Sequence, residues 1–227
     1  YSVPNKGMWC CVGTGMENHG KYNQFIYTHS GDALFVNLFV ASELNWKAKG
    51  ITLRQETSFP YSESSRINIT QSSNTKQPTP IMVRYPGWVK TGQFSVKVNG
   101  KPVSIVTGPS SYVAINRQWK KGDVIDIQFP MYNSVKYLPH LPQYIALMHG
   151  PILLGMKTGT EDLAHLVADD SRFGQYASGK KLPINEAPIL INDNIDEIAA
   201  QIKDIEGQPL HFMLETKMVN GTSSILQ

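Results

Sequence analysis

Cysteine is scarce in this sequence, and its placement excludes a disulfide framework. The chain has two cysteines, Cys10 and Cys11, and they are adjacent. A bridge between neighbouring residues is strained and links no distant segments, so disulfides do not hold this fold together. The spacing leaves two interpretations open: a pair of reduced thiols beside a helix, or a centre of metal or nucleophile chemistry.

Long apolar runs and a strong excess of one charge are also lacking. No segment approaches the roughly 20 apolar residues that a membrane span requires. The net charge is +3, and the 21 lysines and arginines are spread along the chain without the basic stripe or motif that nucleic-acid binding needs. We therefore expect neither a membrane span nor a nucleic-acid partner.

The chain does contain enough apolar sequence for a folded core. Its 227 residues suit one large domain or two small ones. A hydrophobic fraction of 41% and a charged fraction of 17% are typical of a folded chain. Because Tyr1-Ser2-Val3-Pro4 runs almost directly into Trp9-Cys10-Cys11, we expect a longer protein of which this is the later part.

Helical spacing is confined to one early segment. Tyr22, Phe25, Ile26 and His29 recur at intervals of three or four residues. This pattern predicts one short amphipathic helix over residues 18–29, with Asn18 as its N-cap.

From residue 33 onward the pattern changes to short strands separated by turns. The run at 34–40 is almost continuously apolar, whereas segments such as 51–57 and 66–70 alternate between apolar and polar residues. Further strands are expected at 81–85, 94–98, 103–106, 112–115 and 124–129. Short strands at this spacing predict a mainly β fold, an antiparallel β-sandwich.

The clearest single turn is Asn99-Gly100. Phe94, Val96 and Val98 alternate before it. A type I′ hairpin turn needs positive φ at both central residues, which Asn and Gly adopt readily. The sequence therefore predicts a hairpin centred on this dipeptide.

The last third of the chain is less regular. Residues 143–155 predict a buried strand, a bend at Gly150-Pro151 and more apolar chain. Residues 156–186 are rich in Gly, Lys, Asp and Ser and predict a long loop. A weak helix at 194–203 and a last strand at 210–219 complete the prediction.

Cys10 and Cys11 are the strongest candidates for chemistry. Two adjacent thiolates can bind one soft or borderline cation, zinc above all, but they cannot complete a tetrahedral site. From spacing alone, two buried structural cysteines are favoured over a metal site. The remaining candidate ligands show no paired spacing: His140, His149, His165 and His211.

Other candidates have plainer structural interpretations. Trp46, Trp88 and Trp119, with Tyr61 and Tyr132, could form a sugar-stacking platform, but in an all-β domain we favour core packing.

Two further patterns are weaker. The neighbouring acids Glu161-Asp162 and Asp169-Asp170 could suggest catalytic carboxylates, yet their polar surroundings favour a solvated loop. Gly13-Thr14-Gly15 lacks the preceding strand and the full fingerprint of a phosphate-binding loop.

Several segments, in order along the chain, resemble one family of bacterial proteins. The segment Trp9-Cys10-Cys11-Val12-Gly13-Thr14-Gly15, with the apolar run at 34–39, is similar to the family once called DUF1680. The segments at 84–88, 98–100 and 149–153 resemble its sandwich region. That family includes the β-L-arabinofuranosidases of glycoside hydrolase families 127 and 146. The resemblance covers about the first two thirds of the chain.

The resemblance implies a catalytic (α/α)6 barrel upstream and β-sandwich domains after it. It divides the chain into residues 1–32 (the end of the barrel, with the Cys-Cys motif and one helix), 33–155 (the β-sandwich) and 156–227 (a loop-rich excursion and C-terminal strands). It also implies a bacterial protein that is periplasmic or secreted.

The resemblance further implies a zinc ion held by a glutamate and three cysteines. Cys10 would be the nucleophile and a zinc ligand, and Cys11 a zinc ligand, because zinc keeps a thiol deprotonated. A separate glutamate would protonate the leaving oxygen. The two glutamates and the third cysteine would belong to the barrel. Glu17 matches none of them and is expected to be an exposed or helix-start acid.

We therefore expect the C-terminal part of a retaining glycoside hydrolase acting on plant-type glycans, inactive without its barrel and with an incomplete zinc site. Its partners would be that barrel and the carbohydrate substrate. Family members carry Cys-Cys-Pro-Pro-Asn where this chain has Cys10-Cys11-Val12-Gly13-Thr14, which leaves substrate preference open. The alternative is a non-catalytic β-sandwich module for interdomain packing or carbohydrate binding.

Overall fold

The computed structural model describes residues 10–73, 77–156, 189–192, 194–219 and 224–226. The chain divides into two units. The first, here called the sandwich unit, comprises residues 22–133 and 148–152, and the second comprises residues 1–21, 134–147 and 153–227. Of the long loop predicted at 156–186, only Met156 lies within the described residues.

One long helix, α1 (Cys10–Ile26), precedes the sheets, and its predicted bounds are wrong at both ends. It begins at Cys10 rather than Asn18. It ends at Ile26 rather than His29, because residues 27–30 form strand β1 (Tyr27–Ser30). β1 pairs antiparallel with β2 (Ala33–Val36). This ladder gives the backbone of β1 hydrogen-bond partners that outweigh its helical spacing.

The first sheet of the sandwich unit has the strand order β1-β2-β6-β9. β6 (Thr79–Tyr85) lies between β2 and β9 (Ser111–Arg117). The β6–β9 pair is antiparallel, whereas β2 and β6 run parallel. The predicted strand at 34–40 stops at Val36, because the chain then leaves the sheet to reach the opposite one.

The second sheet has the strand order β3-β4-β5-β10-β7-β8, and every neighbouring pair is antiparallel. The sequence did not predict β3, because an edge strand carrying polar residues has no apolar pattern. A short 3-10 turn, η1 (Lys47–Lys49), joins it to the next strand. The strands are β3 (Ser42–Trp46), β4 (Ile51–Glu56), β5 (Ser64–Ser72), β10 (Val124–Gln128), β7 (Ser95–Val98) and β8 (Lys101–Pro102).

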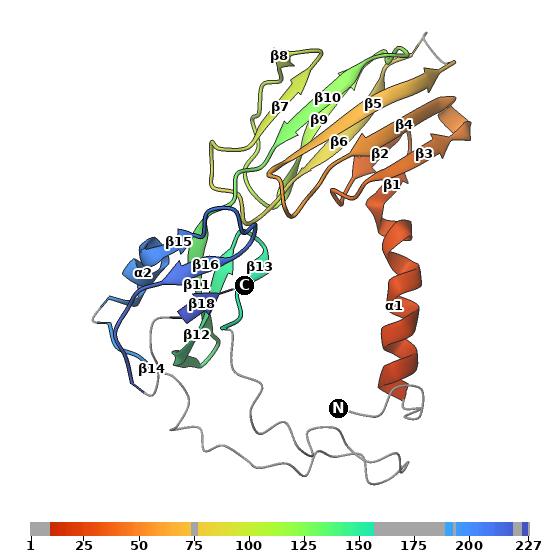
Figure 1. Ribbon diagram of the computed structural model, residues 1–227. Helices are drawn as coiled ribbons and strands as arrows, with labels where there is room; N and C mark the ends of the chain where they lie inside the picture. Colours follow the sequence, from red (N-terminus) through yellow and green to blue (C-terminus); the bar gives the residue numbers. More distant parts are fainter. Residues whose placement is uncertain (1–9, 74–76, 157–188, 193, 220–223, 227) are drawn as a thin grey trace. The chain divides into compact units, whose positions relative to one another are not determined.

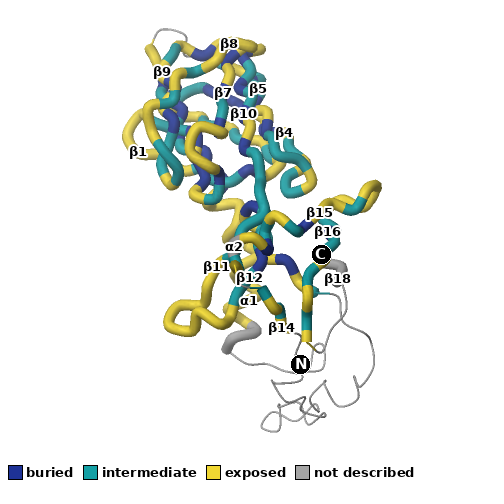
Figure 2. The backbone as a smooth tube through the Cα atoms, turned by 90° about the vertical axis from the view of Figure 1, so that its left-hand side faces the viewer, coloured by how far each residue is buried: buried dark blue, intermediate teal, exposed yellow. Residues whose placement is uncertain are grey.

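The two sheets share one hydrophobic core, which confirms the predicted β-sandwich. In β2, β5, β6, β7 and β10, alternate residues are buried, as the period of two requires. Ile67 and Ile69 of β5 and Ile81 and Val83 of β6 are fully buried, and all four belong to one cluster. Figure 1 shows the strands of this unit, and Figure 2 shows its buried residues lying inside and its exposed residues on the surrounding loops.

Asn99-Gly100 forms the predicted hairpin turn. The two residues have φ values of 50° and 77°, as a type I′ turn requires. The strand after the turn is β8 and not the predicted 103–106. The Val103 N–H still donates to the Val96 carbonyl at 2.9 Å, and no strand is formed over the residues that follow, up to Ser110.

A separate three-stranded sheet follows the sandwich sheets along the chain. It consists of β11 (Asn133–Leu138), β12 (Leu141–His149) and β13 (Ile152–Leu153). The predicted bend is present, with φ of 55° at Gly150. The expected buried strand is buried only in part, because the first four residues of β12 are exposed.

The described elements of the second unit are short. β14 (Ile189–Leu190) pairs with β17 (Met218–Val219). β15 (Ile202–Asp204), β16 (Phe212–Leu214) and β18 (Ser224–Leu226) form a second small sheet. The strand predicted at 210–219 is thus two strands, β16 and β17, which belong to different sheets.

The helix predicted at 194–203 is shorter than expected. It is limited to α2 (Ile195–Ile198) and the 3-10 turn η3 (Ala199–Gln201), after which the chain enters β15. Ile198, Phe212 and Leu214 are no more than 2% exposed and form a small core. No helix within the described ranges is both long enough and apolar enough to cross a membrane.

Candidate functional site

The adjacent cysteines are the first two residues of α1. Cys10 and Cys11 have helical backbone, and their side chains lie outside the described residues. The first turn of a helix leaves backbone N–H groups without intrahelical partners and carries partial positive charge. In general, helix N-termini lower the pKa values of cysteine thiols.

The residues after the pair continue the helix rather than form a loop. Gly13-Thr14-Gly15 is helical, which excludes a phosphate-binding loop there. His19 Nδ1 lies 2.8 Å from the carbonyl oxygen of Gly15, one turn earlier. Glu17 is exposed on the helix. Among the described residues, nothing lies within 4 Å of a Cβ built at Gly13, Gly15 or Gly20.

The donor chemistry of the pair fits zinc, but the described residues do not complete a site. Zinc takes four ligands, and two thiolates supply at most two. In the part of the chain that the structure describes, no three His, Cys, Asp or Glu side chains are grouped to hold a metal ion.

The later histidines have other surroundings. His149 Nδ1 lies 2.8 Å from Asn133 Oδ1. His211 Nδ1 lies 3.0 Å from the Pro209 carbonyl oxygen. His140 is exposed in the turn between β11 and β12. His165, like both pairs of neighbouring acids, lies outside the described residues.

The tryptophans pack mainly as core residues. Trp119 is 1% exposed and its Nε1–H donates to the Thr79 carbonyl at 2.7 Å. Trp88 stacks on Phe59 with ring centroids 6.1 Å apart and meets the core at Phe129. These contacts agree with core packing rather than a shared sugar-stacking platform.

The other aromatic candidates are less enclosed. Trp46 lies partly buried beside His29, with ring centroids 5.9 Å apart. Tyr132 has the Lys90 ammonium 4.2 Å from its ring centroid. Tyr61 is 71% exposed and is therefore the one of the five candidates whose ring is most open to solvent.

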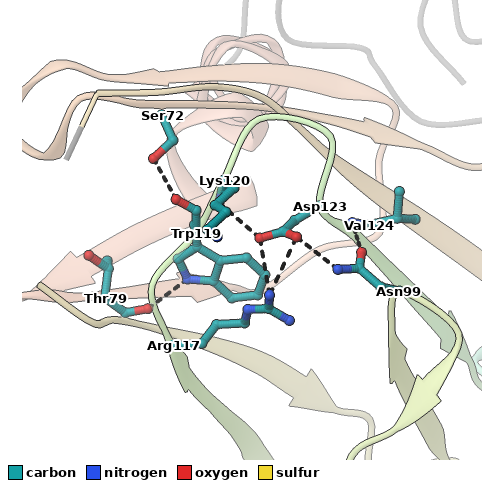
Figure 3. Close-up of polar contacts among 8 residues, drawn as sticks. All are labelled: Ser72, Thr79, Asn99, Arg117, Trp119, Lys120, Asp123 and Val124. Carbon is teal, nitrogen blue, oxygen red and sulfur yellow. Dashed lines mark hydrogen bonds and ion pairs between the residues drawn. The ribbon is translucent and has the colours of Figure 1, made fainter. Parts of the chain in front are cut away.

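A buried carboxylate, Asp123, ties two turns of the sandwich together (Figure 3). It accepts hydrogen bonds of 2.8 Å from Asn99 Nδ2 and from the Lys120 backbone N–H, and Arg117 lies 3.4 Å away. Burial alone would raise its pKa. The two hydrogen bonds and the positive charges of Arg117 and Lys120 outweigh that effect, so the pKa of Asp123 lies below its usual value. Every contact is with the fold itself, so this cluster is structural.

Sequence reasoning missed a polar groove on the second sheet of the sandwich. It crosses the ends of β3, β4, β5 and β10 and encloses about 880 Å³. Its charged walls come from Glu43, Arg54, Glu56, Arg66 and Asp126. The alternation of polar and apolar residues in these strands indicates which side chains point outward. It does not indicate which outward side chains are neighbours, because that depends on the strand register.

Behind the groove, on the buried face of β4, lies the amide of Gln55, which is 1% exposed. Its Nε2 donates to the carbonyl oxygens of Leu38 and Val40 at 3.0 and 2.8 Å. Its Oε1 accepts from Ser65 Oγ at 3.2 Å. These bonds hold the segment between β2 and β3 against the sheet.

Two family models match the chain, one after the other. Residues 33–131 match the middle domain of glycoside hydrolase family 127, described as β-L-arabinofuranosidase. Residues 134–227 match DUF4986, a domain of unknown function. No curated protein sequence matches the chain.

Solved structures share its fold. A glycoside hydrolase is 20% identical with a TM-score of 0.67, over 100% of this chain and 39% of its own. The GH127 β-arabinofuranosidase BT3674 is 21% identical with a TM-score of 0.55, over 88% of this chain and 32% of its own. The GH127 β-L-arabinofuranosidase Ara127N from Geobacillus stearothermophilus T6 is 18% identical with a TM-score of 0.56, over 96% of this chain and 36% of its own. The chain thus spans well under half of each.

The sandwich fold agrees with the match of residues 33–131 to the middle domain of glycoside hydrolase family 127 and with the fold of the solved glycoside hydrolases. With DUF4986 after it, the chain fits the C-terminal part of such a protein, which confirms the resemblance found in the sequence.

Proposed function

We propose that this chain is the C-terminal part of a retaining β-L-arabinofuranosidase acting on plant-type glycans, and that it is inactive without an upstream catalytic barrel. The carrying observation is the order of parts along the chain. The cysteine pair opens α1, α1 continues directly into β1, and the match to the family 127 middle domain begins at Ala33, the first residue of β2.

In this proposal Cys10 is the nucleophile. Its thiolate attacks the anomeric carbon, a C–S bond forms, and the bond to the leaving oxygen breaks while an acid of the barrel protonates that oxygen. Water then attacks the same carbon and gives its proton to the same barrel residue, now a carboxylate, while the C–S bond breaks and the thiolate is restored. Two displacements give net retention. The position of Cys10 in the first turn of α1 supports its role, because that turn favours the negative charge of the thiolate.

Zinc is the cofactor that the thiol pair suits, with Cys10 and Cys11 as two of its ligands and the others supplied upstream. When bound, the metal would keep the nucleophilic thiol deprotonated at neutral pH. At the last residue of α1, the Asn37 N–H donates to the Ile26 carbonyl at 2.9 Å.

A second candidate function is a non-catalytic module. The groove supports it, because that groove is polar and all its lining residues belong to the sandwich unit. For the isolated 227-residue chain this module role is the proposed one.

The test compares hydrolysis of an aryl β-L-arabinofuranoside by this chain and by a version extended upstream through the barrel. We expect turnover and bound zinc only in the extended protein. Cys10→Ser in that protein is expected to abolish turnover, and Glu17→Gln, an exposed acid on the same helix, to leave it unchanged. Turnover by the short chain alone, or by Cys10→Ser, would overturn the proposal.

A further inference from the structure

The polar groove of the sandwich unit is the strongest feature that the proposed hydrolysis does not use. Its volume of about 880 Å³ falls within the range of roughly 300–1,000 Å³ that small-molecule sites occupy. Its lining consists of hydroxyl, amide, carboxylate and guanidinium side chains, with Ala41 as the one apolar residue.

Four of the charged groups of the groove form ion pairs. Glu56, Arg66 and Asp126 stand directly opposite one another on β4, β5 and β10. Arg66 Nε lies 2.7 Å from Asp126 Oδ1. Glu56 Oε1 lies 3.3 Å from Arg54 Nε, and its Oε2 accepts from Asn68 Nδ2 at 3.2 Å. The carboxylates of Glu56 and Asp126 are thus each oriented by a neighbour.

These paired groups keep free hydrogen-bonding capacity toward solvent. The side chains of Glu56 and Asp126 are 49% and 28% exposed, and that of Arg66 is 58% exposed. A carboxylate has about four acceptor sites and a guanidinium five donors, so the contacts described above use only part of each. Oriented donors and acceptors side by side suit the neighbouring hydroxyls of a sugar.

The charge balance favours a neutral ligand. The lining has three carboxylates and two guanidinium groups, so pairing leaves a formal excess of one negative charge. A field this small neither attracts a polyanion nor concentrates cations. A protein partner is disfavoured too, because the centres of protein interfaces are depleted of charged residues and enriched in aromatic ones.

An exposed aromatic ring stands beside the groove. Tyr61 lies in the loop between Ser58 and Ser62, which both line the groove, and its N–H donates to the Ser58 carbonyl at 2.8 Å. The side chain is 71% exposed, which leaves a ring face available for stacking on a sugar. Thr57 Oγ1 fixes the loop by donating to the Ser64 carbonyl at 2.8 Å.

We propose that this groove binds a segment of neutral oligosaccharide, with the Glu56, Arg66 and Asp126 row contacting hydroxyl groups and Tyr61 stacking at the rim. It is a non-catalytic sugar site whose lining residues all belong to the sandwich unit. The inference rests on the proposed function only for the choice of arabinose-based probe.

The test is an NMR titration of the full 227-residue chain with a linear arabino-oligosaccharide, and with an acidic galacturonate oligosaccharide for comparison. We expect a dissociation constant on the order of 1 mM for the neutral sugar. The shifted amides should cluster at residues 54–66 and 126–128. Tyr61→Ala and Asp126→Asn are each expected to weaken binding by about tenfold.

Matched variants separate binding from folding. Tyr144→Ala removes another exposed tyrosine, 44% exposed and outside the groove, and Lys101→Gln removes a charge at the edge of the same sheet. Both are expected to bind like the original chain. The thermal midpoint of Tyr61→Ala should be unchanged, because the Tyr61 contact to Ser58 is made by its backbone.

Three outcomes overturn the inference: shifts away from the groove, equal or stronger binding of the acidic sugar, or no shifts with either sugar. Because binding is read without hydrolysis, failure of the proposed activity would leave this result intact. Conversely, the titration can overturn sugar binding by the groove while the extended protein, also as Asp126→Asn, hydrolyses the aryl glycoside normally.

Discussion

Replacing Asp123 by Asn is expected to destabilise the sandwich more than its small chemical change suggests. Asp123 is 7% exposed and accepts hydrogen bonds from Asn99 Nδ2 and the Lys120 N–H, with Arg117 at 3.4 Å. Asparagine keeps one acceptor oxygen but loses the negative charge and offers an N–H₂ group to donors. The Arg117 guanidinium would then face no carboxylate.

The size of the effect follows from the kinds of bond lost. Hydrogen bonds to charged groups contribute about 1.5–3 kcal/mol and neutral ones about 0.5–1.5 kcal/mol, so we expect Asp123→Asn to lower the free energy of unfolding by about 2 kcal/mol at pH 7. Because the folded-state pKa of Asp123 is lowered, its stabilisation is complete above the unfolded-state value of about 3.9. It is lost as the pH falls through the lower folded-state pKa, so the difference between the proteins should shrink there.

Urea unfolding followed by tryptophan fluorescence measures this difference. Trp46, Trp88 and Trp119 all lie in the sandwich unit, so the signal reports mainly that unit. Asp126→Asn is the matched control, because its exposed ion pair with Arg66 is expected to contribute at most about 1 kcal/mol. Equal losses in the two variants, or a gap that stays constant from pH 7 to acid, would refute the argument.

Other substitutions test the fold at separate points. Gln55→Leu leaves the Ser65 hydroxyl and two backbone carbonyls without their partner. Urea unfolding should therefore show a free energy of unfolding that is lower by about 2–4 kcal/mol. A decrease smaller than that caused by a substitution at an exposed position would contradict this prediction. At Gly150 φ is 55°, and a Cβ added there would lie 2.6 Å from Met131 Cγ. Gly150→Ala should therefore lower the thermal midpoint by an amount equivalent to about 1–3 kcal/mol of unfolding free energy. An unchanged midpoint would show that the substitution causes no strain. Gly20→Ala meets nothing within 4 Å among the described residues and should raise helix stability by about 1 kcal/mol in circular dichroism; a loss of helix would show a hidden contact.

Strand positions followed from local pattern wherever one face of the strand is buried. Residues 66–70 of β5 alternate between polar and apolar because the strand buries one face in the core, so the apolar positions could be read directly. The turn at Asn99-Gly100 could be read for a different reason, since few other dipeptides accept positive φ twice.

The boundary between α1 and β1 could not be read locally. Tyr22, Phe25, Ile26 and His29 have helical spacing, yet His29 lies in β1 because its strand pairs with β2. Helical Gly13 and Gly15 run against their propensity. For His29 the partner strand β2 decides the conformation, and a short sequence window does not contain that partner.

The groove escaped prediction because its residues look like a solvated sheet face. Glu56, Arg66 and Asp126 lie far apart in the sequence, and only the register of β4, β5 and β10 sets them side by side. The cysteine pair was found by motif. Its ligand set and its role as nucleophile stay predictions, because the side chains of Cys10 and Cys11 lie outside the described residues.

The most direct test of the central claim is to find where a sugar becomes covalently attached during turnover. The protein extended through its barrel would be mixed with an aryl β-L-arabinofuranoside, quenched within one turnover, digested and examined by mass spectrometry. We predict one anhydropentosyl group on the sulfur of Cys10, and no adduct in the Cys10→Ser variant. An adduct on a carboxylate, or turnover with retention and no adduct on Cys10, would contradict the account.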